Sequence, residues 1–320
     1  MVLVLSEERD ESTSQVIDWL VSLGKSFFRI NQEDNIEILL LDTSNFIILV
    51  NKSHEISSQQ VNGFWYRRGF FSYPKTKKDF ELSDFKLNRD IHSHLALEWE
   101  ALHFMLHKIL EKRQILGGFS NSHLNKIHQL DVANNFEINT PSTLVTTQKG
   151  RVNQFIDKHK IIITKSINYA LTLNIDGKNY MTYTEKVDER SLKAMPDTFY
   201  ASLFQEYIEK KYEIRAFYLA GIFYSMAIFS QSNSKTEIDF RKYDQKLPNR
   251  CVPFKIPIEV EAKLRRLIQF YKLDTCSVDL IFSHDFKFYF LEINPVGQFG
   301  MVSYPCNYFL ERKIADFFLQ

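Results

Sequence analysis

The sequence predicts an α/β protein, with α+β character in part, and three observations support this fold class. Apolar segments of strand length alternate with amphipathic segments of helix length along most of the chain. Hydrophobic residues make up 44% and charged residues 25% of the sequence, which is the balance of an ordinary globular protein. A chain of 320 residues is long for one domain, so we expect two or three domains.

Residues 1–117 are expected to form the first domain. Ser12 or Thr13 suits the N-cap of its first helix, which should end at Gly24. A second, long helix is predicted over residues 89–113. Strands are predicted at residues 2–5, 26–30, 37–41, 45–50 and 63–69.

The remaining sequence predicts a small central domain over residues 118–198 and a third domain over residues 199–320. The central domain contains an Asp176-Gly177 turn that is typical of a β-hairpin. Its other elements are predicted helices at 125–133 and 150–158 and strands at 142–147 and 160–165. The third domain should contain a strand-rich segment at 213–230, a helix at 258–271, and a hairpin of 276–282 with 287–294.

The composition argues against several kinds of partner and site. With 40 basic and 39 acidic residues the net charge is +1, which does not suit nucleic acid or an anionic membrane surface. No apolar run approaches the ~20 residues that span a bilayer. Three widely spaced cysteines and no secretory signal indicate a reducing cytoplasm. The sequence has neither GxGxxG nor GxxxxGK[ST], so any nucleotide would be bound without those glycine loops.

The last predicted hairpin carries a group of oxygen-bearing side chains. With its turn at the midpoint, Asp279 lies opposite Phe290, and Glu292 lies opposite Ser277. Alternation along the strands then places Asp279, Glu292 and Asn294 on one face, with the two carboxylates as diagonal neighbours. Such oxygens are the ligands that Mg²⁺ takes when it also binds phosphates. A solvated polar face would explain the same pattern.

Basic and acidic residues upstream suit a bound nucleotide. Lys165 ends an apolar strand, from which its ammonium group could reach a phosphate, and Lys126 opens a helix. Glu213 and Arg215 share one strand face, and would offer a hydroxyl acceptor beside a fork for phosphate. The extended residues 204–208 could meet an adenine edge through their backbone. The alternatives are surface lysines and a structural ion pair.

These residues occur in one order along the chain, and this order resembles the ATP-grasp superfamily of carboxylate–amine ligases. The full set is Lys126, residues 141–143 (PST), Lys165, residues 205–208 (QEYI), residues 213–215 (EIR), residues 239–241 (DFR), Asp279 and residues 292–295 (EINP). Residues 65–68 (WYRR) together with 291–299 (LEINPVGQF) resemble the graspetide, or microviridin-type, peptide-maturing ligases. Residues 303–308 (SYPCNY) look like the grasp-with-spasm branch of that group.

The resemblance implies an ATP-grasp fold with three parts. They are an N-terminal Rossmann-like pre-ATP-grasp domain, a central small domain whose hairpin around Asp176-Gly177 is the lid over ATP, and a C-terminal ATP-grasp domain. It also implies roles for individual residues. These are Lys126 and Lys165 for the nucleotide phosphates; Glu206, Tyr207 and Ile208 for adenine; Glu213 for ribose; Asp279, Glu292 and Asn294 for Mg²⁺, usually two ions; and Arg215 and Arg241 for the transferring phosphoryl group.

The activity implied is maturation of a ribosomally made precursor peptide, composed of a leader and a core. ATP would convert side-chain carboxylates of Asp or Glu into acyl phosphates, because the bare carboxylate is a poor acyl donor. A Thr or Ser hydroxyl would then form an ω-ester, or a Lys amine an ω-amide, closing a macrocycle. The branch resemblance favours the ester, and the group also suggests a homodimer. The alternatives are a ligase that adds amino acids to a carboxylate, and a non-catalytic module that binds ATP and presents a peptide.

Residues that would contact the peptide are less clearly marked. Arg67 or Arg68 is expected at the substrate, although a strand whose arginines pair with carboxylates would look the same. Asp188 and Glu189, in the stretch 185–190, are the candidates for binding the leader. His103 and His107 are spaced as a zinc pair would be, but the HExxH glutamate is missing, so we interpret them as core residues.

Overall fold

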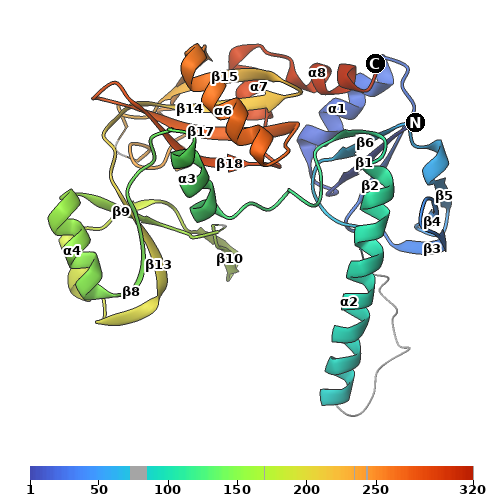
Figure 1. Cartoon of the computed structure of the whole chain (residues 1–320), viewed down its shortest axis with the longest axis horizontal. Coiled ribbons are helices and arrows are strands. Elements are labelled where there is room, and N and C mark those ends of the chain that lie inside the picture. Colours follow the sequence, from blue (N-terminus) through green and yellow to red (C-terminus); the bar gives the residue numbers. More distant parts are fainter. Residues whose placement is uncertain (73–84, 169, 234, 243, 320) are drawn as a thin grey trace. The chain divides into compact units, whose positions relative to one another are not determined.

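The computed structural model describes residues 1–72, 85–168, 170–233, 235–242 and 244–319 (Figure 1). The chain divides into two compact units. Unit 1 consists of residues 1–122, 298–303 and 309–320, and unit 2 consists of residues 123–297 and 304–308. The division falls within helix α7 (Gly300–Cys306). The three domains with boundaries at 117 and 198 stay a prediction.

Unit 1 is built on a four-stranded sheet in which every pairing is parallel. Its order is β2-β1-β6-β7, formed by β1 (Val2–Ser6), β2 (Phe27–Asn31), β6 (Gly63–Tyr66) and β7 (Gln114–Leu116). β1 is buried at all five positions, as expected for a central strand of a parallel sheet. The predicted strands at both ends of the first helix are therefore confirmed, whereas β7, which directly follows the long helix predicted over residues 89–113, was not predicted.

Helix α1 (Glu11–Ser22) joins β1 to β2, and its N-cap is Asp10. The Asp10 side chain accepts a hydrogen bond from the Thr13 amide. The predicted N-cap at Ser12 or Thr13 is therefore wrong. Three residues of capping type lie within four positions here, and the helix begins after the first of them, Asp10, whose carboxylate also pairs with Arg67 and Arg68. Gly24 has a positive φ of 66° just past the helix end, as predicted.

The rest of unit 1 is a small antiparallel sheet and two further helices. The sheet has the order β3-β4-β5, and its strands are β3 (Ile36–Leu41), β4 (Phe46–Val50) and β5 (His54–Ser57), followed by the 3₁₀ turn η1 (Ser58–Gln60). Helix α2 (Phe85–Leu110) extends beyond the sheet of its own unit (Figure 1). From residue 87 on, where its burial is described, the fully buried apolar residues are Leu106, Ile109 and Leu110 in its last turns. Helix α8 (Leu310–Phe317) packs against α1.

Unit 2 begins with helix α3 (Lys126–Asn135) and a four-stranded antiparallel sheet. The sheet order is β12-β9-β13-β8, formed by β8 (Thr143–Gln148), β9 (Ile162–Lys165), β12 (Glu185–Lys186) and β13 (Thr198–Glu206). Helix α4 (Lys149–His159) covers this sheet through a core of Val152, Ile162 and Phe204. The hairpin of β10 (Thr172–Ile175) and β11 (Lys178–Met181) turns at Asp176 and Gly177, both at positive φ, as predicted. Helix α5 (Glu189–Ala194) follows β12.

The second sheet of unit 2 has five antiparallel strands in the order β16-β15-β14-β17-β18. They are β14 (Lys210–Leu219), β15 (Ile222–Phe229), β16 (Arg250–Phe254), β17 (Thr275–Ser283) and β18 (Phe288–Asn294). Helix α6 (Ile258–Phe270) packs on one face through Leu264, Leu267 and Ile268, and α3 joins the same apolar core. None of the described helices is both long and apolar enough to cross a membrane.

The register of the last hairpin differs from the prediction. Asp279 lies opposite Glu292, and Ser277 lies opposite Asn294, because the pairing shifts between Asp279 and Leu280. Leu280 pairs with Phe290, so one extra residue of β18 is accommodated as a β-bulge. The predicted partners Phe290 for Asp279 and Ser277 for Glu292 are therefore wrong, and the two carboxylates are direct rather than diagonal neighbours.

Candidate active site

A row of charged side chains crosses the five-stranded sheet of unit 2. Arg215 on β14 is the register partner of Asp279 on β17, which in turn is the partner of Glu292 on β18. The Arg215 Nη1 atom donates to both oxygens of Asp279, at 2.8 and 2.6 Å. The Asn294 Nδ2 atom donates to Asp279 Oδ2 at 3.2 Å and to Glu292 Oε1 at 3.1 Å. Asp279, Glu292 and Asn294 therefore share one face, as the alternation predicted.

The two carboxylates are neutralised from different sides. Lys126, in the first turn of α3, places Nζ 2.8 Å from Glu292 Oε2. Burial alone would raise the pKa of Glu292, but the ammonium groups of Lys126 and Lys165 lower it to about 2. Burial raises the pKa of Asp279, the facing Glu292 carboxylate adds to this rise, and Arg215 opposes it. Glu292 is thus the carboxylate that holds its charge most firmly.

Lys165 stands at the end of β9, where the strand leaves the smaller sheet. It is half-buried, and its ammonium group makes no hydrogen bond or ion pair with any residue in the described part of the chain. Burial lowers the pKa of its ammonium group to about 8; Glu292 and Asp279 oppose this shift, while Lys126 and Arg241 add to it. An unpaired cation beside this acidic pair is available to an anionic ligand.

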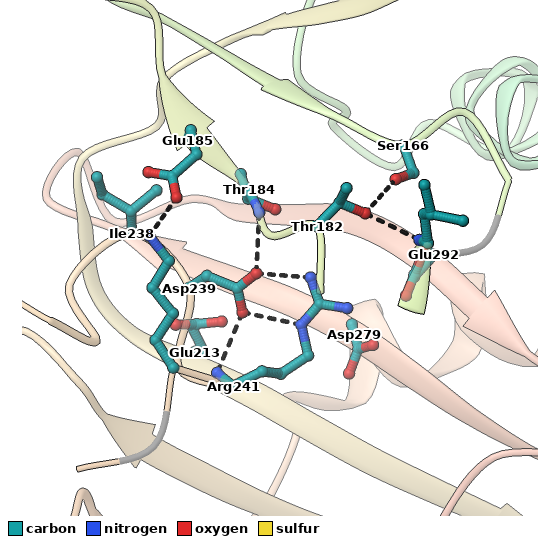
Figure 2. A network of polar contacts seen from close by, with 12 residues as sticks. Ser166, Thr182, Thr184, Glu185, Glu213, Ile238, Asp239, Arg241, Asp279 and Glu292 are labelled. Atoms are coloured by element: carbon teal, nitrogen blue, oxygen red, sulfur yellow. Dashed lines mark hydrogen bonds and ion pairs between the residues drawn. The ribbon is translucent and has the colours of Figure 1, made fainter. Parts of the chain in front are cut away.

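Asp239 and Arg241 form a two-nitrogen ion pair close to Asp279 (Figure 2). The Arg241 Nε and Nη2 atoms donate to the two oxygens of Asp239 at 2.8 and 2.6 Å. The Thr184 amide also donates to Asp239 at 3.1 Å. The hydrogen bonds to Asp239 raise the pKa of Arg241. The Arg241 side chain is nevertheless 50% exposed, so its remaining N–H groups can meet a ligand.

Glu213 lies on the same strand face as Arg215 but is held by other partners. Lys210 Nζ donates to Glu213 Oε1 at 2.7 Å, and Ser230 donates to the same oxygen at 3.0 Å. Burial raises the pKa of Glu213, and Lys210 opposes the rise. Both hydrogen bonds use Oε1, which leaves Oε2 as the acceptor for a ligand. Lys210 has no place in the sequence prediction, although its spacing of three residues from Glu213 was visible.

The segment predicted to meet adenine joins the two sheets of unit 2. Glu206 ends β13, and its carboxylate accepts from the Ser142 amide at 2.9 Å and lies 3.0 Å from His159 Nδ1. The Tyr207 amide donates to the Ile161 carbonyl. Burial, with a contribution from Glu237, raises the pKa of Tyr207 to about 12. The Glu206 side chain thus holds the segment in place. Ile208 is half-buried and lies two residues before β14.

The predicted peptide-contacting residues have structural partners. Arg67 and Arg68 belong to unit 1, where their Nε atoms lie 3.2 and 3.0 Å from Asp10 Oδ2. Burial lowers the pKa of Arg67 to about 10, while Asp10 opposes this. Asp188 is the N-cap of α5 and accepts from Ser191. Glu189 faces Lys193 on the same helix, and both side chains are exposed.

The donor set around Asp279 suits a divalent cation only with help from a ligand. The described residues include no group of three or more His, Cys, Asp or Glu that could hold a metal. The two carboxylates are nevertheless hard oxygen donors on one face, and the Asn294 side chain would add its carbonyl oxygen by turning over its amide, whose nitrogen now faces them. Mg²⁺ is commonly held by one or two carboxylates together with substrate phosphates. The surrounding Lys126, Lys165 and Arg241 would meet such phosphates, so the residues fit this cation.

His103 and His107 form a buried pair in unit 1. Their Nε2 atoms lie 3.2 Å apart, and rings of Phe71 and Phe119 surround them. Burial lowers the pKa of His103 to about 4 and that of His107 well below its usual value. The pair is packed as core, in agreement with the interpretation from the sequence.

Comparison with known proteins gives structural matches. No protein-family model and no curated protein matches the sequence. A RiPP-associated ATP-grasp ligase from Chryseobacterium gregarium, solved with ADP and a leader and core peptide, is 24% identical, with a TM-score of 0.81 over 99% of this chain and 94% of that chain. The macrocyclase MdnC from Microcystis aeruginosa MRC, bound with precursor peptide MdnA, is 23% identical, with a TM-score of 0.79 over 99% of both chains.

A third match is the ATP-grasp ligase PsnB with a phosphomimetic variant of its minimal precursor, Mg and ADP. It is 15% identical, with a TM-score of 0.69 over 99% of this chain and 97% of that chain. The three structures cover nearly the whole of the chain, including both sheets of unit 2 and the strands of unit 1. The chain therefore has the ATP-grasp fold.

Proposed function

We propose that this protein is an ATP-dependent peptide ligase that macrocyclises a ribosomally made precursor peptide. The observation that carries the proposal is the row of Arg215, Asp279 and Glu292 across one sheet, surrounded by Lys126, Lys165 and Arg241. The two matched structures with the highest TM-scores given above contain a leader and core peptide or a precursor peptide. That likeness supports a peptide, rather than a free amino acid, as the substrate.

The nucleotide would bind between charged groups of unit 2. Lys126 and Lys165 would contact its phosphates, and Lys165 is already unpaired among the described residues. Asp279, Glu292 and Asn294 would hold Mg²⁺, and we propose two ions. The matched PsnB structure, a complex that contains both Mg and ADP, supports this choice of cation. Bound Mg²⁺ would neutralise phosphate charge. Lys126 would then exchange its contact with Glu292 for one with phosphate.

Adenine and ribose would be recognised by two neighbouring parts of unit 2. The backbone of Glu206, Tyr207 and Ile208 would meet adenine, since Glu206 and Ser142 already hold this segment extended. Glu213 would accept from a ribose hydroxyl through its Oε2 atom. The hairpin at Asp176-Gly177 would close over the nucleotide and exclude water. Its exposed apolar side chains, Leu171, Leu173, Ile175 and Tyr180, suit a segment that packs on closing.

The reaction would proceed in two displacements. An Asp or Glu carboxylate of the peptide attacks the γ-phosphorus, which gives an acyl phosphate and releases ADP. A Thr or Ser hydroxyl of the same peptide then attacks the acyl carbon, forms the ω-ester and expels inorganic phosphate; a Lys amine would give the ω-amide. Arg215 and Arg241 would stabilise the charge on the transferring phosphoryl group. Each is oriented by a carboxylate, Asp279 or Asp239.

The candidate peptide-contacting residues differ in how exposed they are and in the partners they already have. Arg68 is 28% exposed and Arg67 only 4%, so Arg68 is the better candidate for a peptide carboxylate. Glu189, whose ion pair with Lys193 is exposed, would meet a basic residue of the leader, whereas Asp188 serves α5 as its cap. A homodimer in the cytoplasm completes the proposal.

Intact-mass spectrometry tests this function. The protein is incubated with Mg²⁺, ATP and the precursor encoded beside its gene, with ADP replacing ATP as the control. We expect losses of one water per crosslink in the ATP sample alone. A gain of amino-acid mass would instead show an amino-acid ligase. An unchanged peptide, with nucleotide binding still detectable, would show a presenting module.

A further inference from the structure

Strand β18 is an edge strand, and two of its last residues, Glu292 and Asn294, belong to the candidate Mg²⁺ site. An edge strand leaves every second residue with backbone groups that its sheet does not pair. At Ile293 those groups are paired by the side chain of Gln129 on α3. Gln129 Nε2 donates to the Ile293 carbonyl at 3.1 Å, and Gln129 Oε1 accepts from the Ile293 amide at 2.5 Å.

These two hydrogen bonds hold the peptide groups on both sides of Ile293. The Ile293 amide belongs to the peptide unit shared with Glu292, and its carbonyl belongs to the unit shared with Asn294. Gln129 and Ile293 are 1% and 2% exposed, so water cannot replace either bond. The side chain therefore fixes the orientation of both flanking residues.

The bulge directly before this segment gives the contact its importance. A slip of one residue would turn Glu292 and Asn294 to the other face of the sheet. The pairing has already shifted between Asp279 and Leu280, where the ladder is interrupted. Beyond the bulge the ladder has only the pairs of Ile293 with Val278 and Asn294 with Ser277 besides that of Glu292 with Asp279, and the Gln129 contact adds to them.

Gln129 also links this register to the charge on Glu292. Lys126 precedes Gln129 by three residues, so the two lie on the same face of α3. Lys126 Nζ contacts Glu292, and Gln129 contacts the next residue. One face of one helix thus supplies both the counter-ion of the carboxylate and the clamp on its backbone.

We infer that Gln129 is a positioning residue, which holds Glu292 and Asn294 where both meet Asp279 and a Mg²⁺–nucleotide complex. The inference rests on the proposed function for the ligand. It adds a residue that touches neither nucleotide nor metal and acts through the backbone of Ile293.

The test replaces Gln129 with Met, which has a similar length and volume but can form neither hydrogen bond. The matched control is Asn139→Ala. The Asn139 side chain donates to the Phe288 carbonyl on the same edge strand, but on the other side of the bulge from Glu292. Gln129→Glu, which keeps the acceptor and loses the donor, serves if the Met variant does not fold.

ADP affinity is measured by calorimetry with and without Mg²⁺. We expect Gln129→Met to lose roughly 10- to 100-fold of the Mg²⁺-dependent affinity, the usual effect of removing a group that orients metal ligands. Affinity without Mg²⁺ should change little, and Asn139→Ala should bind as wild type. A folded Gln129 variant with wild-type Mg²⁺-dependent affinity would overturn the inference.

Hydrogen exchange at residues 292–294 separates this inference from the proposed function. A wild-type protein that binds no ADP would contradict the function, but faster exchange at Ile293 in Gln129→Met would still establish the clamp. Unchanged exchange at that amide would overturn the clamp whatever the protein binds.

Discussion

Glu292 and Asp279 are neighbours of like charge that differ in how they are neutralised. Glu292 meets the ammonium group of Lys126, and its pKa is lowered to about 2. Asp279 meets the Nη1 atom of Arg215, and its pKa is raised because burial and Glu292 outweigh the effect of this guanidinium. A cation bound between the two carboxylates would relieve their repulsion. The negative charge of these two carboxylates thus complements the positive charge of a bound Mg²⁺.

Glu292→Gln should remove turnover and leave the fold intact. The amide keeps the shape of the side chain, and the lost attraction to Lys126 is offset by relief of repulsion from Asp279. We expect the free energy of unfolding to change by about 1 kcal/mol or less. Crosslinking is followed by intact mass, and unfolding by denaturant. Retained crosslinking with a large loss of stability would show that Glu292 is structural.

Arg215→Lys should be nearly as severe, because a compact ammonium group cannot replace a planar guanidinium that contacts Asp279 through Nη1 and has further N–H groups for a phosphoryl group. The expected fall in turnover is on the order of 100-fold or more, typical of losing a donor at developing charge. Arg265→Lys is the matched control, since Arg265 forks onto Glu261 on helix α6 without touching the acidic row. Equal losses in both variants would contradict a specific role for Arg215.

At the scale of elements, the site depends on the path of the segment that follows β18, which runs close to β17. Gly297 follows the strand, and a Cβ atom there would lie 2.2 Å from Ser277 Oγ and 2.7 Å from the Ser277 backbone nitrogen. Ser277 is the register partner of Asn294. Close approach of the two backbones therefore holds the segment after Asn294 against β17.

Gly297→Ala should force this segment away from Ser277 and displace Asn294. We expect a loss of stability of about 1–3 kcal/mol, the usual cost of overpacking, and weaker Mg²⁺-dependent ADP binding. Gly150→Ala on α4 is the control, because nothing lies within 4 Å of its added Cβ. That variant should be as stable as wild type or up to about 1 kcal/mol more stable. Wild-type stability and binding in Gly297→Ala would refute the close approach.

The two buried histidines near the end of helix α2 make the stability of the protein depend on pH. The pKa of His103 is lowered to about 4 from 6.5, and that of His107 is also lowered by burial. The unfolded chain therefore binds more protons between pH 6.5 and 4. Stability is fully present above about pH 6.5 and declines as the pH falls through this window, by roughly 1 kcal/mol per pH unit and histidine.

Thermal unfolding of wild type and His103→Phe between pH 7.5 and pH 4.5 checks this prediction. The variant should lose less stability on acidification than the wild type. An identical decline in the two proteins would mean that other groups cause it.

The sequence predicted the elements of this site better than their register. Alternation along 288–294 placed the three oxygen donors on one face, and the structure agrees. It missed the bulge, although a signal was present: the buried residues Phe290 and Ile293 are three apart, where a regular strand has an even spacing. Gln129 could not be predicted, because a glutamine on a helix does not show which distant backbone it will meet.

At the scale of the whole molecule, the order of motifs predicted the fold although only 24% or less of the residues are identical to those of the matched structures reported above. Helix ends and short strands such as β5 and β7 were missed, since strands of three or four residues leave little periodicity to detect.

The central claim is that the peptide carboxylate, rather than the hydroxyl, is phosphorylated by ATP. The direct measurement uses a precursor whose Asp and Glu carboxyl groups carry the heavy isotope of oxygen, with mass spectrometry of the released phosphate. The account predicts one heavy oxygen in phosphate for each crosslink formed. Crosslinked peptide with phosphate that carries no heavy oxygen would contradict it, because the label would then have stayed in the ester.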